Sequence, residues 1–179
     1  MNKIASGNDP NIQLLFHGTS SLCEFLQTLD VNHLCDHGRE NIFDCGLCGI
    51  ALESFRVDRI GRTRRPAGAW QRFGDGFYFS KHSSKCHFYG KVGERYSSNG
   101  RRYRVMYQCN VALGLQYTPE HADTSIRSPP DGYHSVKGAI GRGGGRGHGS
   151  LNYEEDVVYT PAACLPRYLI VYSYDSSTE

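Results

Sequence analysis

The sequence predicts a single α+β domain, and three observations support this prediction. The chain has 179 residues, enough for one hydrophobic core of ordinary size. Its 21 glycines and 12 tyrosines indicate many turns between aromatic strands. Residues 101–113 alternate as a half-buried strand does, whereas the apolar residues of 22–29 follow helical spacing. We therefore expect a flexible arm over residues 1–11, one domain over 12–174 and a polar tail over 175–179.

Charge and cysteine content limit the classes of function. The formal net charge of +2 is close to balanced and does not by itself indicate nucleic acid or a membrane surface as a partner. No apolar run approaches the ~20 residues of a membrane span, and the N-terminus lacks the apolar core of a signal peptide. Seven cysteines, an odd number, then favour free thiols or a metal site over a disulfide framework. We expect a monomeric intracellular protein of the cytoplasm or nucleus that does not bind membranes.

The N-terminal part of the domain predicts a strand and then a helix. A short apolar strand over residues 12–16 leads into His17-Gly18-Thr19, where a side chain and an open backbone can meet a ligand together. Taken alone, the tripeptide fits an ordinary strand end with a turn glycine better. Ser21 and Glu24 have capping-box spacing, which predicts an amphipathic helix over residues 22–29.

Residues 31–55 form a cysteine-rich excursion. Cys45 and Cys48 have Cys-x-x-Cys spacing, which we interpret as a hairpin suited to a tetrahedral metal, with Cys23 and Cys35 as the completing thiolates. Structural zinc and plain buried thiols remain equally open, because the spacing matches no finger. The substitute ligands are His33 and His37.

Residues 56–71 are rich in arginine. A solvated charge run is the usual interpretation, and a loop that folds over a pyrophosphate is the functional one, because the guanidinium fork matches phosphate oxygens. Trp70 either covers an adenine or anchors this loop. The arginines are Arg56, Arg59, Arg62, Arg64 and Arg65.

The rest of the chain is organised around residues 72–89. Gly74 and Gly76 predict a tight turn, residues 77–79 an aromatic strand, and the residues after them a helix capped by Ser80 and ended by Gly90.

Two tyrosines of this stretch are the candidate ligand-binding rings. Tyr78 and Tyr89 are placed to hold a flat ring between them, and two half-buried core tyrosines are the alternative.

The last informative stretch is residues 151–159, in which Glu154 and Glu155 open a strong β pattern. A carboxylate on a central strand is costly unless it has a role, and exposed glutamates at the strand start are the alternative. A final strand is expected over residues 167–174. Residues 128–138 form an ordered turn region, and the Arg/Gly-rich residues 141–149 a surface loop.

Three motifs in a fixed order resemble the catalytic domain of the poly(ADP-ribose) polymerase family, the diphtheria-toxin-type ADP-ribosyltransferases. The resemblance covers residues 14–172. Residues 128–138 are similar to the tankyrase branch, and the cysteine excursion resembles fungal members, in which cysteines recur at similar places. The tankyrase zinc lies elsewhere in the chain and is not carried over. The motifs are His17-Gly18-Thr19, Gly76-Phe77-Tyr78-Phe79-Ser80 with Ser83-Ser84-Lys85 and Tyr89, and Tyr153-Glu154-Glu155-Asp156-Val157-Val158-Tyr159.

The resemblance implies two packed antiparallel β-sheets that form an NAD⁺ cleft, with flanking helices and a His-Tyr-Glu triad. Matching the motifs residue by residue assigns the triad to His17, Tyr78 and Glu155. Glu155 is chosen over Glu154 because the family's glutamate lies four residues before the tyrosine that ends this strand, here Tyr159.

The resemblance also implies how NAD⁺ binds. The backbone of Gly18 would hold the nicotinamide amide, His17 the adenosine ribose, and the rings of Tyr78 and Tyr89 would stack on nicotinamide. One position departs from the family, because Cys86 stands where a serine usually binds the carboxamide, and a thiol is a weak donor. The remaining expected NAD⁺ contacts are Thr19, Phe79, Lys85, Cys86 and Arg72.

The expected activity is cleavage of the nicotinamide–ribose bond of NAD⁺ and transfer of ADP-ribose to a protein, which includes the enzyme itself. Nucleic acid is a second acceptor class without support in the sequence. Only about 16 residues precede His17, so we expect no regulatory helical domain and constitutive activity. Whether one or many ADP-ribose units are transferred stays open. The alternatives are an inactive NAD⁺- or ADP-ribose-binding module and a zinc-stapled RNA-binding domain.

Overall fold

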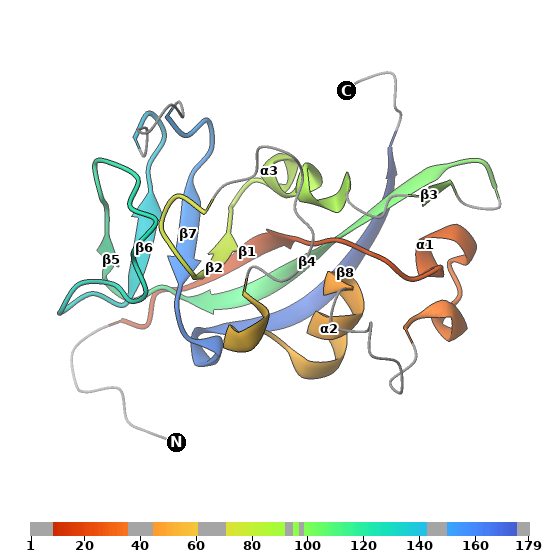
Figure 1. Cartoon of the computed structure of the whole chain (residues 1–179), viewed down its shortest axis with the longest axis horizontal. Coiled ribbons are helices and arrows are strands. Elements are labelled where there is room, and N and C mark those ends of the chain that lie inside the picture. The colour runs from red at the N-terminus through yellow and green to blue at the C-terminus, as the bar shows by residue number, and fades with distance from the viewer. Residues whose placement is uncertain are drawn as a thin grey trace.

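The computed structural model describes residues 9–35, 45–60, 71–91, 95–96, 99–142 and 150–174 and has a mixed α+β fold with two sheets and few helices (Figure 1). The strands are β1 (Ile12–Gly18), β2 (Phe77–Phe79), β3 (Arg95–Tyr96), β4 (Arg102–Ala112), β5 (Gln116–Tyr117), β6 (Ser135–Gly138), β7 (Glu155–Val158) and β8 (Cys164–Tyr174). The helices are α1 (Phe25–Thr28), α2 (Gly46–Glu53) and α3 (Ser83–His87), with 3₁₀ turns η1 (Val31–His33), η3 (Val57–Arg59), η4 (Tyr89–Lys91) and η5 (Pro161–Ala163).

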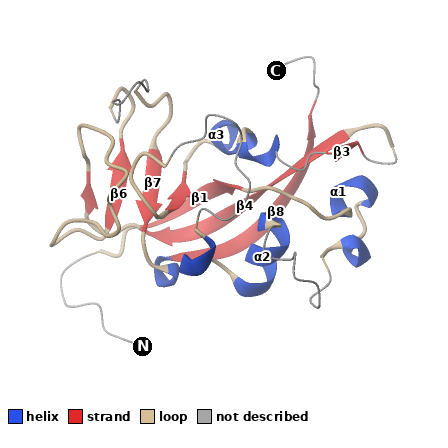
Figure 2. Ribbon diagram, in the orientation of Figure 1, coloured by secondary structure: helices blue, strands red, loops and turns tan. Residues whose placement is uncertain are grey.

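The first sheet is built around the long strand β4, which pairs antiparallel with β1, β3 and β8 (Figure 2). The register places His17 opposite Tyr107 and Gly18 opposite Met106. The predicted strands at residues 12–16, 101–113 and 167–174 are confirmed, and β1 continues through the histidine and glycine of the first motif.

The second sheet has the order β2-β7-β6-β5. β7 lies between β2 and β6, so both of its backbone edges are paired, and all of its residues are buried. β5 and β6 pair parallel, so the expectation of two wholly antiparallel sheets is wrong at this edge. Residues 118–134 make the long connection that parallel pairing requires.

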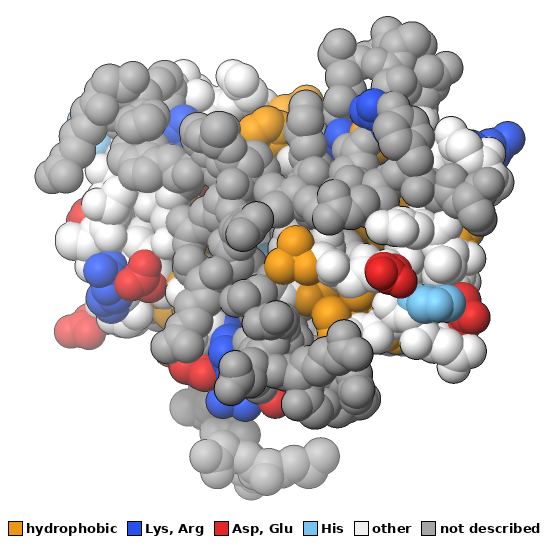
Figure 3. All heavy atoms as spheres, turned by 45° about the vertical axis from the view of Figure 1, so that its right-hand side comes forward, with side chains coloured by type: hydrophobic (Ala, Val, Ile, Leu, Met, Phe, Trp, Pro, Cys, Tyr) orange, Lys and Arg blue, Asp and Glu red, His pale blue; other side chains and the backbone are white. Residues whose placement is uncertain are grey.

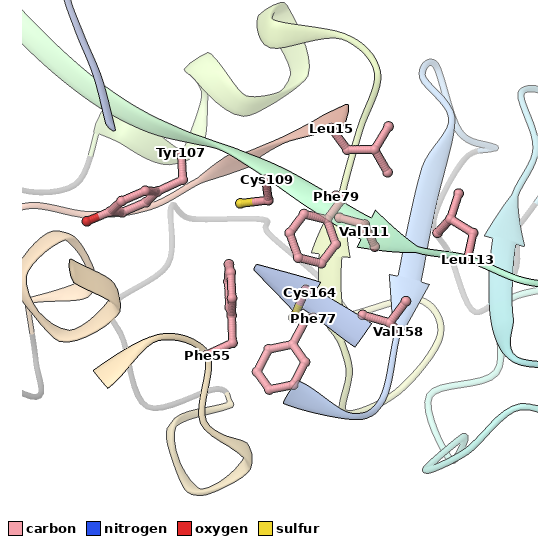
Figure 4. Packing of buried hydrophobic residues seen from close by; sticks show 10 residues of the cluster. All are labelled: Leu15, Phe55, Phe77, Phe79, Tyr107, Cys109, Val111, Leu113, Val158 and Cys164. Carbon is pink, nitrogen blue, oxygen red and sulfur yellow. The ribbon is translucent and has the colours of Figure 1, made fainter. Parts of the chain in front are cut away.

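The two sheets pack against each other through one apolar cluster, which Figure 4 shows from close by. Phe77 and Phe79 alternate with Tyr78 along β2, so the two phenylalanines face the first sheet and the tyrosine faces the other way. The facing side chains of β4 are Tyr107, Cys109 and Val111, which Figure 4 shows with the rest of the cluster.

The opposite face of β4 was predicted to lie toward solvent, and this holds only in part: Gln108 and Asn110 are half-buried, but Arg104 and Met106 are buried. Arg104 is fully buried, because His87 of α3 covers it: the guanidinium contacts the imidazole Nε2 of His87 and donates to its carbonyl at 3.2 Å. Arg104 also donates to the hydroxyl of Tyr174 at 2.7 Å and stacks over that ring. A periodic pattern cannot show which polar face a distant helix will cover.

Helix boundaries also differ from the predictions. The Ser21–Glu24 capping box does not form: α1 begins at Phe25, its N-cap makes no side-chain hydrogen bond, and the Ser21 hydroxyl contacts the Cys23 sulfur instead. No helix among the described residues is long and apolar enough to cross a bilayer.

The helix after β2 was also misplaced. Ser80 does not cap it: His82 occupies the N-cap position, without a side-chain hydrogen bond, and the Ser80 hydroxyl donates to the carbonyl of Glu154 at 2.9 Å. Gly90 does not end it either and lies inside η4.

Candidate functional site

A cavity of about 1230 Å³, which includes its open mouth, lies between the two sheets and α2. Segments far apart in the sequence line it: the end of β1, α2 with the residues that follow it, β2, the α3–η4 region and the start of β7. All three sequence motifs meet here.

The carboxylate of Glu155 is the buried acid of this cavity, with only 5% of its side chain exposed. One oxygen, Oε1, pairs with the ammonium of Lys85 at 2.7 Å. The other oxygen, Oε2, is buried and has no hydrogen-bond partner within the described part of the chain. Buried carboxylate oxygens normally have a partner, so Oε2 is available for a donor on a ligand. The alternative of exposed glutamates is wrong for Glu155, since β7 is central in its sheet.

Substituting Lys85 by Met tests the ion pair. Without the ammonium both oxygens of Glu155 would be buried without a partner, so we expect the free energy of unfolding to fall by about 1–3 kcal/mol. Thermal and chemical denaturation measure this change. Lys137→Met is the matched control, because Lys137 pairs with the less buried neighbour Glu154 at 3.0 Å and should cost at most about 1 kcal/mol. Equal losses in the two variants would contradict a special role for the Lys85 pair.

His17 is held in one orientation at the inner end of β1. Its Nδ1 lies 2.9 Å from the carbonyl oxygen of Tyr78, and because a carbonyl only accepts, Nδ1 carries the proton. The ring packs edge-on against Phe55 at 5.0 Å and tilted against Phe79 at 5.5 Å. Burial lowers the pKa of His17 below its usual 6.5, against the opposing effect of the hydrogen bond to Tyr78. Nε2 is therefore an acceptor at neutral pH.

The pH dependence of stability should report this environment. Because the folded-state pKa of His17 lies below 6.5, the unfolded chain binds more protons between the two values. Stability from this residue is fully present above pH 6.5 and is lost as the pH falls through the folded pKa, at no more than about 1.4 kcal/mol per pH unit. Between pH 7.5 and 5, thermal denaturation should show a smaller loss of stability for His17→Gln than for the unmodified protein. Parallel curves of stability against pH for the two proteins would contradict this environment of His17.

The two tyrosines proposed to hold a flat ring both line the cavity. The Tyr78 hydroxyl accepts from the amide of Phe73 at 3.0 Å and donates to the carbonyl of Gly74 at 2.9 Å. This turn requires glycine, because Gly74 has φ +71° and a Cβ would lie 1.8 Å from the Ile126 carbonyl oxygen. The ring of Tyr78 is thus fixed by its own turn. Tyr89 lies near the acid, with Lys85 Nζ 6.0 Å from its ring centre.

Gly18 and Cys86 lie against each other at the base of the same region. A Cβ on Gly18 would lie 2.4 Å from the carbonyl oxygen of Cys86 and 2.9 Å from Cβ of Tyr89, so only glycine fits. Burial raises the pKa of the Cys86 thiol to about 12, which leaves it neutral and a poor nucleophile. Cys86 therefore contributes shape and a weak donor to the cavity.

Some of the remaining predicted NAD⁺ contacts line the cavity, and one does not. Thr19 and Phe79 line the cavity as expected, whereas Arg72 does not, although its neighbour Gln71 does. Arg56 and Arg59 of the arginine-rich stretch also line the cavity. The other expected participants of that stretch lie outside the described residues: Arg62, Arg64, Arg65 and Trp70. Most of the loop at residues 141–149 lies outside them too.

Sequence reasoning missed the wall that α2 contributes. Gly46, Gly49, Ile50 and Glu53 of this helix and the Phe55 that follows it all line the cavity. The signal for them is weak, because two glycines three residues apart in a cysteine-rich segment do not predict a helix facing a ligand.

The four cysteines predicted to lie together do so. The sulfur atoms of Cys23, Cys35, Cys45 and Cys48 all lie within 4.8 Å of one another, close enough to hold a metal ion. The Cys48–Cys23 and Cys45–Cys23 sulfur distances are 3.7 and 4.0 Å. A tetrahedral site with metal–sulfur bonds of ~2.3 Å has sulfurs ~3.8 Å apart, so the cluster has the required size.

Backbone amides stabilise negative charge on two of these sulfurs. The amide of Leu22 donates to Cys45 Sγ and that of Cys35 to Cys48 Sγ, both at 3.3 Å. Hydrogen bonds with Cys23 and Cys48, together with the Leu22 amide, lower the pKa of Cys45. Such thiolate character suits a metal ligand.

The Cys-x-x-Cys segment is not the predicted hairpin, because Cys45 is the N-cap of α2 and Cys48 lies one turn into it. The proposed substitute ligand His33 is exposed and contacts Thr28 instead, and His37 lies outside the described residues.

Comparison of the chain with protein-family models and with curated proteins gave no match. The function is therefore inferred from the residues that line the cavity and from their geometry.

Acidic and basic side chains are intermixed on the face of the molecule in Figure 3, as far as its residues are described.

Proposed function

We propose that the protein is an NAD⁺-dependent ADP-ribosyltransferase with the fold of the diphtheria-toxin type. The observation that carries the proposal is the convergence of His17, Tyr78 and Glu155 on one cavity, with Glu155 Oε2 buried and without a partner among the described residues. Three polar groups of this kind seldom meet in a cavity for packing alone.

Each group has a role that its geometry supports. Nicotinamide lies between the rings of Tyr78 and Tyr89, with its amide beside the backbone of Gly18, which also lines the cavity. His17 is neutral, and its Nδ1–H donates to the Tyr78 carbonyl. Its Nε2 therefore accepts a hydrogen bond from a hydroxyl of the adenosine ribose. Glu155 Oε2 accepts from the 2′-hydroxyl of the nicotinamide ribose.

Cleavage of the nicotinamide–ribose bond passes through a state with cationic character on the ribose, as in glycoside hydrolysis. The electron pair of the bond leaves with nicotinamide, which is neutral once expelled, so no strong general acid is required. A fixed carboxylate beside the sugar stabilises the positive charge as it develops. The same carboxylate can orient an acceptor nucleophile and receive its proton.

The proposal is tested by incubating the protein with NAD⁺ labelled in its adenylate part. We expect release of nicotinamide and label attached to protein, with the protein itself as the first acceptor to examine. NAD⁺ binding in calorimetry without nicotinamide release would instead identify an inactive binding module. If folded protein neither binds NAD⁺ nor releases nicotinamide, the proposal is overturned.

For the four-cysteine cluster, structural Zn²⁺ is the metal that the donor set favours. Four sulfur ligands leave no position open for substrate, which is the pattern of structural rather than catalytic zinc. Elemental analysis of purified protein should find one zinc per chain.

The alternative of RNA binding through the arginine-rich stretch has no observation in its favour among the described residues.

A further inference from the structure

Helix α2 takes part in both the four-cysteine cluster and the cavity. Cys45 and Cys48 at its start belong to the cluster, whereas Gly49, Ile50 and Glu53 line the cavity. The helix has only 8 residues, and a helix this short is marginal in isolation. Its position therefore depends on what holds its ends.

The start of α2 is held tightly against the segment that follows His17-Gly18. The amide of Leu47 donates to the carbonyl of Ser20 at 2.9 Å, and the amide of Leu22 donates to Cys45 Sγ at 3.3 Å. A Cβ on Gly46 would lie 1.9 Å from the hydroxyl oxygen of Thr19, so the backbone of α2 packs directly against the Thr19 side chain. Both segments line the cavity at this contact.

The other end of α2 reaches the triad. Phe55, which follows the helix, packs edge-on against the His17 ring at 5.0 Å. Between these ends, the hydroxyl of Tyr107 on β4 donates to the carbonyl of Leu47 at 2.6 Å. A displacement of α2 would thus widen the cavity beside Thr19 and release one face of His17.

Of the four cluster cysteines, only Cys45 lines the cavity. Cys23 follows β1 and Cys35 follows η1, and both lie outside it. An ion bound by all four sulfurs would cross-link these two segments to Cys45 and Cys48, the first turn of α2. Without an ion, the cluster is four free thiols, and negative charge on more than one of them would be repulsive.

We infer that a thiolate-preferring metal ion in the four-cysteine cluster fixes α2 as a wall of the cavity, so that nucleotide affinity depends on metal occupancy. This inference rests on the proposed function, because the nucleotide is the NAD⁺ or ADP-ribose that the cavity is proposed to bind. By linkage, the nucleotide must tighten metal binding by the factor by which the metal tightens nucleotide binding.

The test uses the intact chain loaded with Zn²⁺, and ADP-ribose as a probe that is not consumed. Calorimetry of zinc-loaded and chelator-treated protein should give a dissociation constant at least tenfold weaker without metal. Cys35→Ser should lose the metal and the affinity together. Cys164→Ser is the matched control, since Cys164 is buried outside the cluster, and should keep both.

Two further measurements apply if the metal-free protein unfolds. ADP-ribose should slow removal of zinc from the unmodified protein by a chromogenic chelator at least tenfold. Gly46→Ala keeps all four cysteines but places a methyl group against the Thr19 hydroxyl in the wall of the cavity, so it should retain zinc and lose at least tenfold in ADP-ribose affinity.

Equal ADP-ribose affinity with and without metal, unchanged zinc release with ADP-ribose, or full affinity in zinc-loaded Gly46→Ala would each overturn the inference. Failure of the proposed function looks different. In that case the zinc-loaded, folded protein binds neither NAD⁺ nor ADP-ribose at all, and the inference falls with it.

Discussion

Glu155→Gln is expected to lower kcat/KM for nicotinamide release from NAD⁺ by about 10²–10³-fold. The substitution keeps the size of the side chain but removes the negative charge that would stabilise the ribose cation. It also replaces the ion pair with Lys85, at 2.7 Å, by a hydrogen bond that the ammonium can still donate to the amide oxygen. Initial rates of nicotinamide release over a range of NAD⁺ concentrations measure the change.

Glu154→Gln is the matched control for this effect. Glu154 is adjacent in sequence, pairs with Lys137 at 3.0 Å and does not line the cavity. Its variant should keep nicotinamide release within a few-fold of the unmodified protein. Similar losses in both variants, or none in either, would mean that Glu155 does not act on the ribose.

Substitution of a cysteine of the proposed zinc site is expected to have the largest effect on stability. Cys48 is almost fully buried, and its sulfur lies 3.7 Å from that of Cys23. Loss of a structural metal belongs to the few single changes that exceed about 4 kcal/mol. For a domain of this size, such a loss corresponds to a fall in Tm of roughly 8–16 °C. Calorimetric melting of Cys48→Ser against the zinc-loaded unmodified protein measures it.

The alternative of plain buried thiols predicts a different result for the same experiment. Cys48→Ser would then resemble Cys164→Ser, whose thiol lies 3.7 Å from the carbonyl oxygen of Pro161 and whose hydroxyl replacement can keep that contact. Both variants would lose about 1 kcal/mol, and purified protein would contain no stoichiometric metal.

The strands could be predicted from the sequence because their signals are local. Alternation over β4, the aromatic residues of β2 and the turn glycine Gly74 each depend on neighbouring residues. Local signals failed where a distant contact competed. Ser21 meets the sulfur of Cys23 instead of capping a helix, and Arg104 is buried by His87 instead of facing solvent.

The candidate site shows the same division. The order of the motifs along the chain named His17, Tyr78 and Glu155, and the spacing of the cysteines named the four sulfur donors. Neither pattern carries distances, so neither could show that Arg72 lies off the cavity. The β pattern around Glu155 was consistent with a carboxylate on a central strand, but no sequence pattern showed that Lys85 would pair with it.

By itself, therefore, the sequence determined which chemical groups the protein has and which strands carry them, because residue type and periodicity are properties of short stretches. Only the tertiary structure decided that α2 joins the four cysteines to the cavity. That placement follows from the close approach of Gly46 to Thr19 and of Phe55 to His17, which are contacts between segments that the chain itself does not make neighbours.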